Sequence, residues 1–544
     1  MKKNVVAIII LLVLVVGAAG GYLLYNFFKG SEKHLQLVPK NAMFVATVDF
    51  KSLILKSEPT KIQQLNWYKD FQKKTAEKSQ SDPQTKSIMD AFNNPLSCGV
   101  NLMSDVYVFA CNTGNAAVAG GLIFDIKDAD AFEKTVKKIS PDIKITSTGN
   151  YKWVQQNDVA LAWNKTGAIV AGVQDKNGTT KLSDFLDVTF SRKLNESILA
   201  NEQFEKFNLS RKDVSVFINM AELYAAIGNF NPTAMMSLSS TPTKDMYAWG
   251  NIDFQKNKVL GTMHVDMPAA TASTMNVLSK SGLSDEHLKD ITPKDCYMLM
   301  SFSCDADKMF ANYEANPSMK TSLDQMAMMT GMSTKDLESI FGGEFSAALV
   351  DFKKLNMPAP VNNPNDPSAA MIQAQLAAIP LPVVTINFSS KNKDGVQKLL
   401  EGKIPLTQDG YYHMNLYGYV DLNLVPNKFG YTLTNDQDIA KKIAGGGNVG
   451  SLPDKVNDLA KNNPALFYMN LDLNTYPQPL RDMASAALGK NYQAFAAYMA
   501  MFKDVIAKGN QQDSEVALNL TQGDDNSLYR FFAQADESYK IVKQ

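Results

Sequence analysis

The sequence predicts an α+β fold, in which an N-terminal transmembrane helix precedes two duplicated units of antiparallel sheet with packed helices. Three observations predict it: a long apolar run near the N-terminus, strand patterns interleaved with short helix patterns, and a sequence motif that occurs twice, each time before a predicted strand. The motif is Val38-Pro39-Lys40-Asn41, and it recurs about half a chain later as Thr292-Pro293-Lys294-Asp295. With 544 residues, the chain also exceeds the size of a single hydrophobic core.

The apolar run from Val5 to Phe28 carries no charge and predicts the membrane anchor. At about 1.5 Å per helical residue it is long enough to cross a tilted bilayer span. A cleaved signal peptide is the alternative, because Gly17-Ala18-Ala19 resembles a small-residue cleavage site. We favour the uncleaved anchor, since Tyr22–Phe28 continues the run. Gly17 and Gly21 form a G-x-x-x-G pair, a candidate for membrane helix packing, with small residues merely tolerated in lipid as the alternative.

Lysines flank this run on both sides, so the charge bias that orients membrane proteins is weak. The very short tail, residues 1–4, makes a cytoplasmic N-terminus the simpler topology. We therefore predict a single-pass inner-membrane protein whose C-terminal region is periplasmic. Residues 29–37 form a polar spacer after the anchor at 5–28.

The first predicted unit covers residues 38–275. A strand over 43–50 opens it, and Asp128 is the expected N-cap of a helix over 129–139. Three short strands between 151 and 172, separated by turn residues, predict an antiparallel meander. A hairpin over 246–266 closes the unit.

The second predicted unit covers residues 276–544 and repeats this order. Many patterns recur at nearly constant offsets, which indicates duplication. The expected elements are strands over 297–302, 345–351, 383–388, 420–424, 431–434 and 465–470, a helix over 393–400, a helical region over 480–508, and a closing hairpin of 515–520 with 528–533.

The second unit carries an insert, residues 355–381, where the first unit has only the short connection 112–121. Long connections in compact domains are often functional, so we expect the insert to bind another envelope component, with a solvated loop as the alternative. The candidate partner-binding residues are Met357, Pro358 and Pro360 in the insert, together with Met326 and Met329 from a nearby methionine cluster. Methionine at helical spacing is more often core, and that interpretation stays open.

Composition excludes several classes of protein. Lys plus Arg total 54 and Asp plus Glu total 55, so the net charge of −1 predicts no nucleic-acid partner. The four cysteines show no C-x-x-C spacing, which excludes a zinc ribbon or a thioredoxin-like motif. Two alternatives stay open for them. They could form the disulfides Cys98–Cys111 or Cys296–Cys304, or they could be free cysteines in the core.

No motif of a catalytic, cofactor or metal site stands out. The histidines are scattered, and neither a G-x-S-x-G elbow nor a phosphate-binding loop occurs. Gly445–Gly450 matches G-x-G-x-x-G, but it follows a helical pattern rather than a strand, so we interpret it as a helix stop. We predict no catalytic residue, no cofactor and no metal.

Three segments resemble a known family: Val48-Asp49-Phe50-Lys51-Ser52-Leu53, Gly99–Phe109 and Ala162-Trp163-Asn164. They are similar to an uncharacterised cell-envelope family of Bacteroidota, domain of unknown function 4836. The resemblance implies export to the envelope and supports the fold, but it implies no activity. The sequence lacks the lipid-attachment cysteine found in many such proteins.

Two hypotheses for function follow. The preferred one is a membrane-anchored periplasmic binding or scaffolding protein, chaperone-like or a subunit of an envelope complex, whose partners are the inner membrane and other envelope proteins. The alternative is an envelope hydrolase whose site is assembled from residues distant in sequence.

Overall fold

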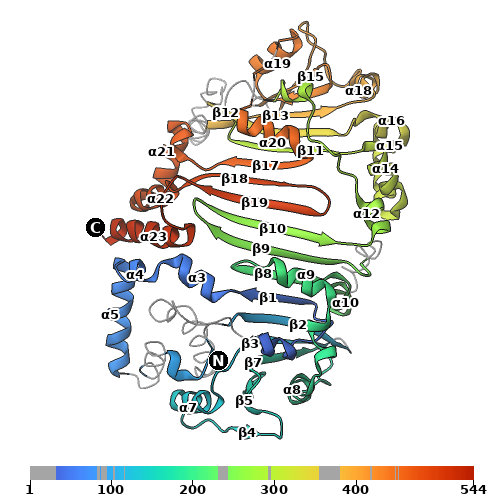
Figure 1. Cartoon of the computed structure of the whole chain (residues 1–544). Coiled ribbons are helices and arrows are strands. Elements are labelled where there is room, and N and C mark those ends of the chain that lie inside the picture. Colours follow the sequence, from blue (N-terminus) through green and yellow to red (C-terminus); the bar gives the residue numbers. More distant parts are fainter. Residues whose placement is uncertain are drawn as a thin grey trace, which may run out of the picture. The chain divides into compact units, whose positions relative to one another are not determined.

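The computed structural model describes residues 32–81, 86, 95–101, 104–114, 117–230, 243–291, 296–354, 380–416, 420–447, 449–450 and 452–543 (Figure 1). Two compact units divide the chain: Met1–Pro268 with Gln522–Gln544, and Ala269–Thr521. Within the described ranges, no helix combines the length and hydropathy needed to cross a membrane. The expected anchor at 5–28, with Gly17 and Gly21, lies outside those ranges.

The first unit contains an antiparallel sheet with the strand order β5-β6-β7-β3-β2-β1-β8-β9-β10, and β4 pairs with β5. The strands are β1 Phe44–Val48, β2 Val106–Gly114, β3 Ala117–Phe124, β4 Thr146–Ser147, β5 Lys152–Gln156, β6 Val159–Trp163, β7 Ala168–Asp175, β8 Val214–Asn219, β9 Tyr247–Gln255 and β10 Lys258–Asp266.

The second unit contains an antiparallel sheet with the order β14-β15-β16-β13-β12-β11-β17-β18-β19. The strands are β11 Met298–Ser303, β12 Glu344–Lys354, β13 Pro380–Ser389, β14 Tyr412–Leu416, β15 Val420–Pro426, β16 Gly430–Thr434, β17 Ala465–Asn470, β18 Phe502–Gly509 and β19 Asp513–Leu520. Apart from the two-residue β4, the two orders correspond strand by strand, which is the relation that duplication of one unit produces. The mixed helices and large antiparallel sheets place the protein in the α+β class.

The compact units differ from the predicted boundaries at two places. Helix α12 (Ala269–Met275) follows β10 but belongs to the second unit. Residues from Gln522 onward follow β19 but belong to the first unit, and they include the C-terminal helix α23 (Ser527–Lys543). In each unit, the segment that follows the last strand is therefore assigned to the other compact unit. A single boundary in the sequence cannot reproduce this division.

The predicted closing hairpin and the predicted helical region at 480–508 are both wrong in part. The hairpin is formed by β18 and β19, whereas residues 528–533 lie in α23. The helical region ends as α21 (Gln478–Leu488) and α22 (Tyr492–Met499), and β18 follows. Short apolar runs fit both a period of 3.6 and a period of 2, and in β18 the buried side chains alternate as in a strand.

Several local predictions are confirmed. Helix α7 spans Ala129–Ile139, and the Asp128 carboxylate accepts hydrogen bonds from the amides of Asp130 and Ala131. Helix α19 (Gln437–Ala444) ends at the glycine run, where Gly446 adopts a φ of 73°. A non-glycine residue would be strained at that position.

The core of the first unit lies between its sheet and the helices α8 (Leu182–Ser191) and α9 (Glu202–Ser210), and the largest side chains there are aromatic. A second cluster, around Phe132 and Trp163, lies beneath α7. In the second unit, α13 (Asp285–Leu288), α19 and α20 (Asp454–Asn462) supply the helical side of the core.

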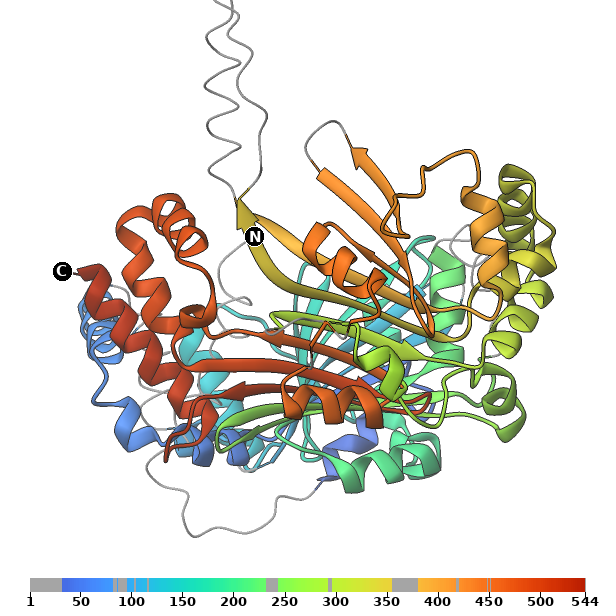
Figure 2. The same cartoon turned by 90° about the horizontal axis from the view of Figure 1, so that it is seen from above.

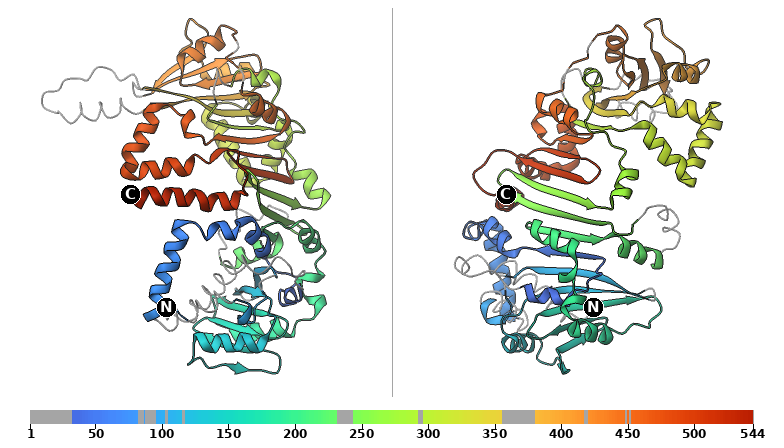
Figure 3. Two further views of the ribbon diagram at one scale, coloured as in Figure 1. Left: turned by 60° about the vertical axis from the view of Figure 1, so that its left-hand side comes forward. Right: turned by 45° about the vertical axis from the view of Figure 1, so that its right-hand side comes forward.

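Helix α23 packs against the helices that follow β1, namely α3 (Phe50–Ser57), α4 (Pro59–Ile62) and α5 (Asn66–Ser81) (Figure 3). The buried Asp536 carboxylate accepts hydrogen bonds from the Trp67 amide and the Asn66 side chain, both at 2.9 Å. Burial alone would raise the pKa of Asp536, but these donors and Lys540 outweigh it, so the pKa lies below its usual value.

We predict that Asp536→Asn loosens α23, because the amide replaces a charged acceptor that is worth about 1.5–3 kcal/mol. Hydrogen–deuterium exchange of residues 527–543, corrected for intrinsic rates, should accelerate about tenfold or more at pH 7. Glu537→Gln, an exposed neighbour, is the matched control and should leave exchange unchanged.

The same contact should depend on pH. The folded pKa of Asp536 is lowered, so its stabilisation is complete above the unfolded value of about 3.9 and is lost as the pH falls through the folded value. Wild type and Asp536→Asn should therefore converge in strong acid. Equal exchange in the two proteins at pH 7 would show that the carboxylate does not hold α23.

Candidate functional site

The face of the second unit's sheet that lies under α13 and α19 carries polar side chains among the apolar ones of the core. Sheets that are covered on one side normally turn apolar side chains to the covered side and polar ones to water. Here the side chains with the lowest exposure include eight polar ones on β11, β12, β13, β15 and β16: Ser301, Ser303, Ser346, Thr385, Asn387, Asn423, Thr432 and Thr434.

The opposite face of this sheet is apolar. Because successive side chains of a strand point to opposite faces, the neighbours of these polar residues turn the other way. Strand pairing aligns them in a central row that crosses all nine strands: Val516, Ala507, Phe467, Met300, Ala347, Ile386, Leu433, Leu424 and Tyr412. Eight strand spacings of about 4.8 Å make this row about 38 Å long.

A second row runs beside the first, two residues along each strand: Leu518, Val505, Met469, Met298, Leu349 and Val384. We call the two rows together the apolar face. Met300 is 46% exposed, Met469 36% and Val516 46%. Tyr412 is the only residue of the two rows whose side chain contains oxygen or nitrogen, and the backbone groups of the strands are engaged in the sheet. Contiguous exposed apolar surface of this kind marks an interaction site.

Helices stand at both ends of these strands. Figures 1 and 2 show α14 (Ala306–Ala315), α15 (Pro317–Thr330) and α16 (Thr334–Ile340) at one end, and α21 and α22 at the other. The side-chain contacts of α16 and α18 (Lys393–Leu400) reach the margin of the face. Phe341, directly after α16, packs on Phe302, and the Tyr431 hydroxyl donates to the Lys393 carbonyl at 2.8 Å. The margin is therefore covered, whereas the centre of the face is open.

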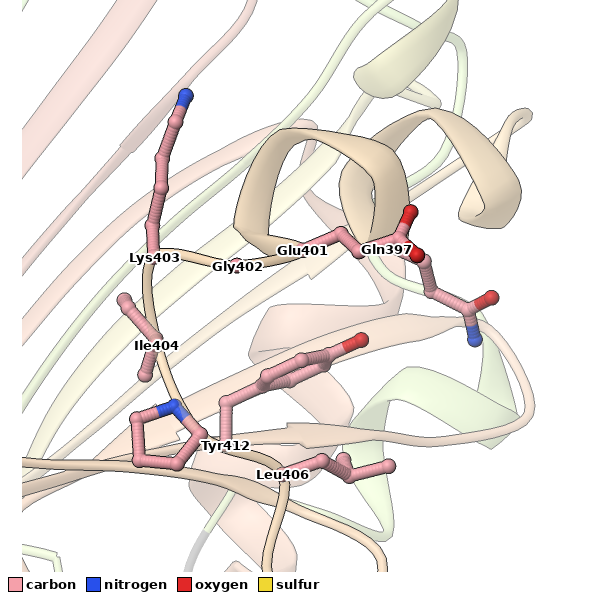
Figure 4. Close-up of a pocket in the computed structure, with 8 residues that line it drawn as sticks. Gln397, Glu401, Gly402, Lys403, Ile404, Leu406 and Tyr412 are labelled. Carbon is pink, nitrogen blue, oxygen red and sulfur yellow. The ribbon is translucent and has the colours of Figure 1, made fainter.

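The central row ends in a pocket of about 620 Å³ (Figure 4). Tyr412 of β14 forms one wall, and α18 with its following loop forms the others. The ring of Tyr412 lies beside the loop, and its hydroxyl points to the same side as Glu401 and Gln397, whereas Lys403 extends away. The lining residues are Gln397, Glu401, Gly402, Lys403, Ile404, Pro405, Leu406 and Tyr412.

On the polar face, His287 joins α13 to β12. Its Nε2 lies 2.8 Å from Ser346 Oγ, and its Nδ1 lies 3.3 Å from Glu344 Oε2. Burial lowers the pKa of His287, and the neighbouring Glu344 offsets this only in part, so the ring is neutral at pH 7. Asn387 donates to Ser346 Oγ at 3.3 Å, and Thr432 donates to Asn387 at 2.6 Å.

This Ser–His–Glu arrangement resembles a hydrolase triad but lacks two requirements. Ser346 and His287 have no exposed surface, so no substrate can reach them in this structure. Ser346 lies in the middle of β12, between Ser301 and Asn387 of the adjacent strands. The backbone amides around it belong to the sheet and are not arranged as an oxyanion hole. The chemistry of this cluster is that of a hydrogen-bonded core.

Within the described ranges, no three histidine, cysteine, aspartate or glutamate side chains gather as a metal site would require. All four cysteines are buried and none is in a disulfide, so neither candidate disulfide forms. Burial raises the pKa of Cys111 to about 11 and that of Cys296 to about 12, which keeps both as thiols at neutral pH.

The predicted partner-binding residues divide into two groups. Met326 and Met329 lie on α15 and are 54% and 88% exposed, so the interpretation of these two methionines as core is wrong. Binding of a partner there stays a prediction. Met357, Pro358 and Pro360 lie outside the described residues.

Sequence reasoning missed the apolar face. Its signal is present in β13, where Val384, Ile386 and Phe388 alternate with Thr385 and Asn387. Alternation predicts a strand with one apolar side, but the usual assumption places that side in the core. Only the position of the covering helices reveals that the polar side is buried.

These features define an α+β protein with two like sheets, of which the second has an exposed apolar face. The family model described as "Domain of unknown function (DUF4836)" matches residues 35–528, and the chain belongs to this family. None of the curated proteins compared matches the sequence.

Solved structures of TP0453 show a distant likeness. Crystal form I is 12% identical with a TM-score of 0.23, and the match covers 44% of this chain and 81% of that one. Crystal form III is 13% identical with a TM-score of 0.24, and covers 47% and 91%. At these TM-scores the likeness supports no argument about fold or function.

We predict that an alkyl fluorophosphonate, which labels activated serines, leaves the full-length protein in native membranes unlabelled. The reason is the burial of Ser346 and the engagement of its neighbouring amides in the sheet. A known serine hydrolase added to the same membranes serves as the positive control. Labelling that disappears in Ser346→Ala would contradict a purely structural cluster and restore the hydrolase hypothesis.

Proposed function

We propose that this protein is a non-enzymatic binding protein of the cell envelope, tethered to the inner membrane, and that the apolar face of the second unit is its binding surface. The observation that supports this proposal is the exposed apolar face of the second unit's sheet, which lies opposite a buried face that carries both apolar and polar side chains. The proposal narrows the binding, scaffolding or chaperone-like role that the sequence suggests.

The exposure of the apolar face has an energetic cost that folding alone does not explain. Burial of apolar surface contributes about 25 cal/mol per Å², and exposed residues such as Met300 and Met469 forgo much of this gain. Violations of the usual pattern are expected where function requires them. A ligand that covers the apolar face recovers the lost burial upon binding.

The chemistry of the face specifies the ligand. Along the two rows, only Tyr412 at one end has an oxygen-bearing side chain, and the backbone amides and carbonyls are paired between strands. A molecule that lies flat on the face therefore gains no hydrogen bonds from it, and any polar group placed there is desolvated without compensation. The part of the ligand in contact with the rows is apolar.

To test the proposal, the full-length protein in lipid nanodiscs is titrated with the apolar dye N-phenyl-1-naphthylamine, with empty nanodiscs as background. We expect saturable fluorescence above background. Met300→Glu should weaken binding at least tenfold, because a charge in the middle of the face must be desolvated by the dye. Met300 is 46% exposed, so the variant should keep the wild-type thermal unfolding temperature.

Met328→Glu is the matched control, because Met328 is 76% exposed on α15 and lies outside the apolar face. It should bind the dye like the wild type. Equal dye binding by wild type, Met300→Glu and Met328→Glu would refute the assignment of the face.

A further inference from the structure

Among the residues of the two rows, the oxygen-bearing side chain lies at one end. The central row begins at Val516 on β19 and ends at Tyr412, whose hydroxyl lies in the pocket beside α18. There the Glu401 carboxylate and the Gln397 amide point to the same side as that hydroxyl (Figure 4). The surface therefore has the character of an amphiphile: apolar over about 38 Å and polar at one terminus.

We infer that the ligand is a lipid, bound with an acyl chain along the central row and its head group in the pocket lined by Glu401 and Tyr412. This inference rests on the proposed function, because it names the ligand of the same face. It adds the chemical class of the ligand and the direction in which the ligand lies.

A hydrocarbon chain suits the row better than a polypeptide does. An extended peptide presents an amide about every 3.3 Å, and each amide needs a hydrogen-bond partner that the row does not offer. An acyl chain has no such groups. The central row contains Met300, Leu433 and Leu424. Flexible side chains such as that of methionine repack readily around an irregular hydrocarbon chain.

The lengths agree as well. The hydrocarbon core of a bilayer is about 30 Å thick, so one acyl chain extends over about 15 Å. From Tyr412, three strand spacings of about 4.8 Å reach Ile386 on β13. A chain whose head group lies in the pocket therefore ends over β13 and the adjacent β12.

The pocket favours a head group that donates hydrogen bonds. A carboxylate such as Glu401 accepts but does not donate at neutral pH, and its charge attracts an ammonium group. Phosphatidylethanolamine has both a primary ammonium group and acyl chains, and it is the probe we choose.

Photo-crosslinking tests the inference. The full-length protein is reconstituted in vesicles that contain phosphatidylethanolamine with a diazirine either close to the glycerol or at the chain terminus. After illumination, peptide mass spectrometry locates the label. We expect the proximal diazirine to label residues 404–412 and the terminal diazirine to label β13 and β12.

A charge reversal at the pocket adds a second measurement. Glu401→Lys should reduce the terminal label on β13 and β12 at least fivefold, because it removes the acceptor for the head group and repels the ammonium. Glu314→Lys, an exposed acid on α14, is the control and should leave the label unchanged.

Each of the other possible outcomes would refute one part of the inference or of the proposed function. Proximal and terminal labels in exchanged positions would refute the direction of the chain. Label confined to residues 5–28, with dye binding still sensitive to Met300→Glu, would refute a lipid ligand but leave the proposed function intact. The same confined label without dye binding would refute both. An unchanged yield in Glu401→Lys would remove the pocket from the site.

Discussion

The second unit depends on the hydrogen-bonded polar layer between its sheet and its helices. Thr432, Asn387 and Ser346 connect β16, β13 and β12, and His287 fixes α13 to the same layer. Buried polar groups of this kind are tolerated only when their hydrogen bonds are made, so the layer specifies one register of the strands. Side chains alternate between faces, and the register that buries the polar set necessarily exposes the apolar set. The position of the apolar face is thus fixed by the same register that buries the side chains of the opposite face.

This arrangement links stability to binding. The present register leaves Met300 and Met469 partly exposed, so their apolar surface is available for a ligand. The aromatic and helical margin, which includes Phe302 and Phe341, limits the open area to the centre of the sheet. In the first unit, the corresponding end of the sheet is closed by α7, whose Phe132 packs on Trp163. A helix therefore covers this end of the sheet in each unit, α7 in the first and α18 in the second.

The repeated order of elements was predictable, because turn residues, strand alternation and helix caps such as Asp128 are local signals. The exchange of α12 and α23 between units was not, since no local signal tells which unit a terminal helix packs on. Residues 502–506 fit both a helix and a strand, and pairing with β17 and β19 decided between them. The apolar face was visible as alternation in β13, but its direction depends on helices distant in sequence. His287 and Ser346 are 59 residues apart, so their contact was equally hidden.

The central claim is that a ligand covers the apolar face in the native membrane. Hydroxyl-radical oxidation of methionine measures this directly in the full-length protein, with Met328 on α15 as the internal reference. We expect Met300, although 46% exposed, to be oxidised at least fivefold more slowly than Met328 in native membranes. After delipidation of the folded protein, the two rates should approach the ratio of their exposures, 46% to 76%. A Met300 rate that already matches this ratio in native membranes, and does not change on delipidation, would contradict the account.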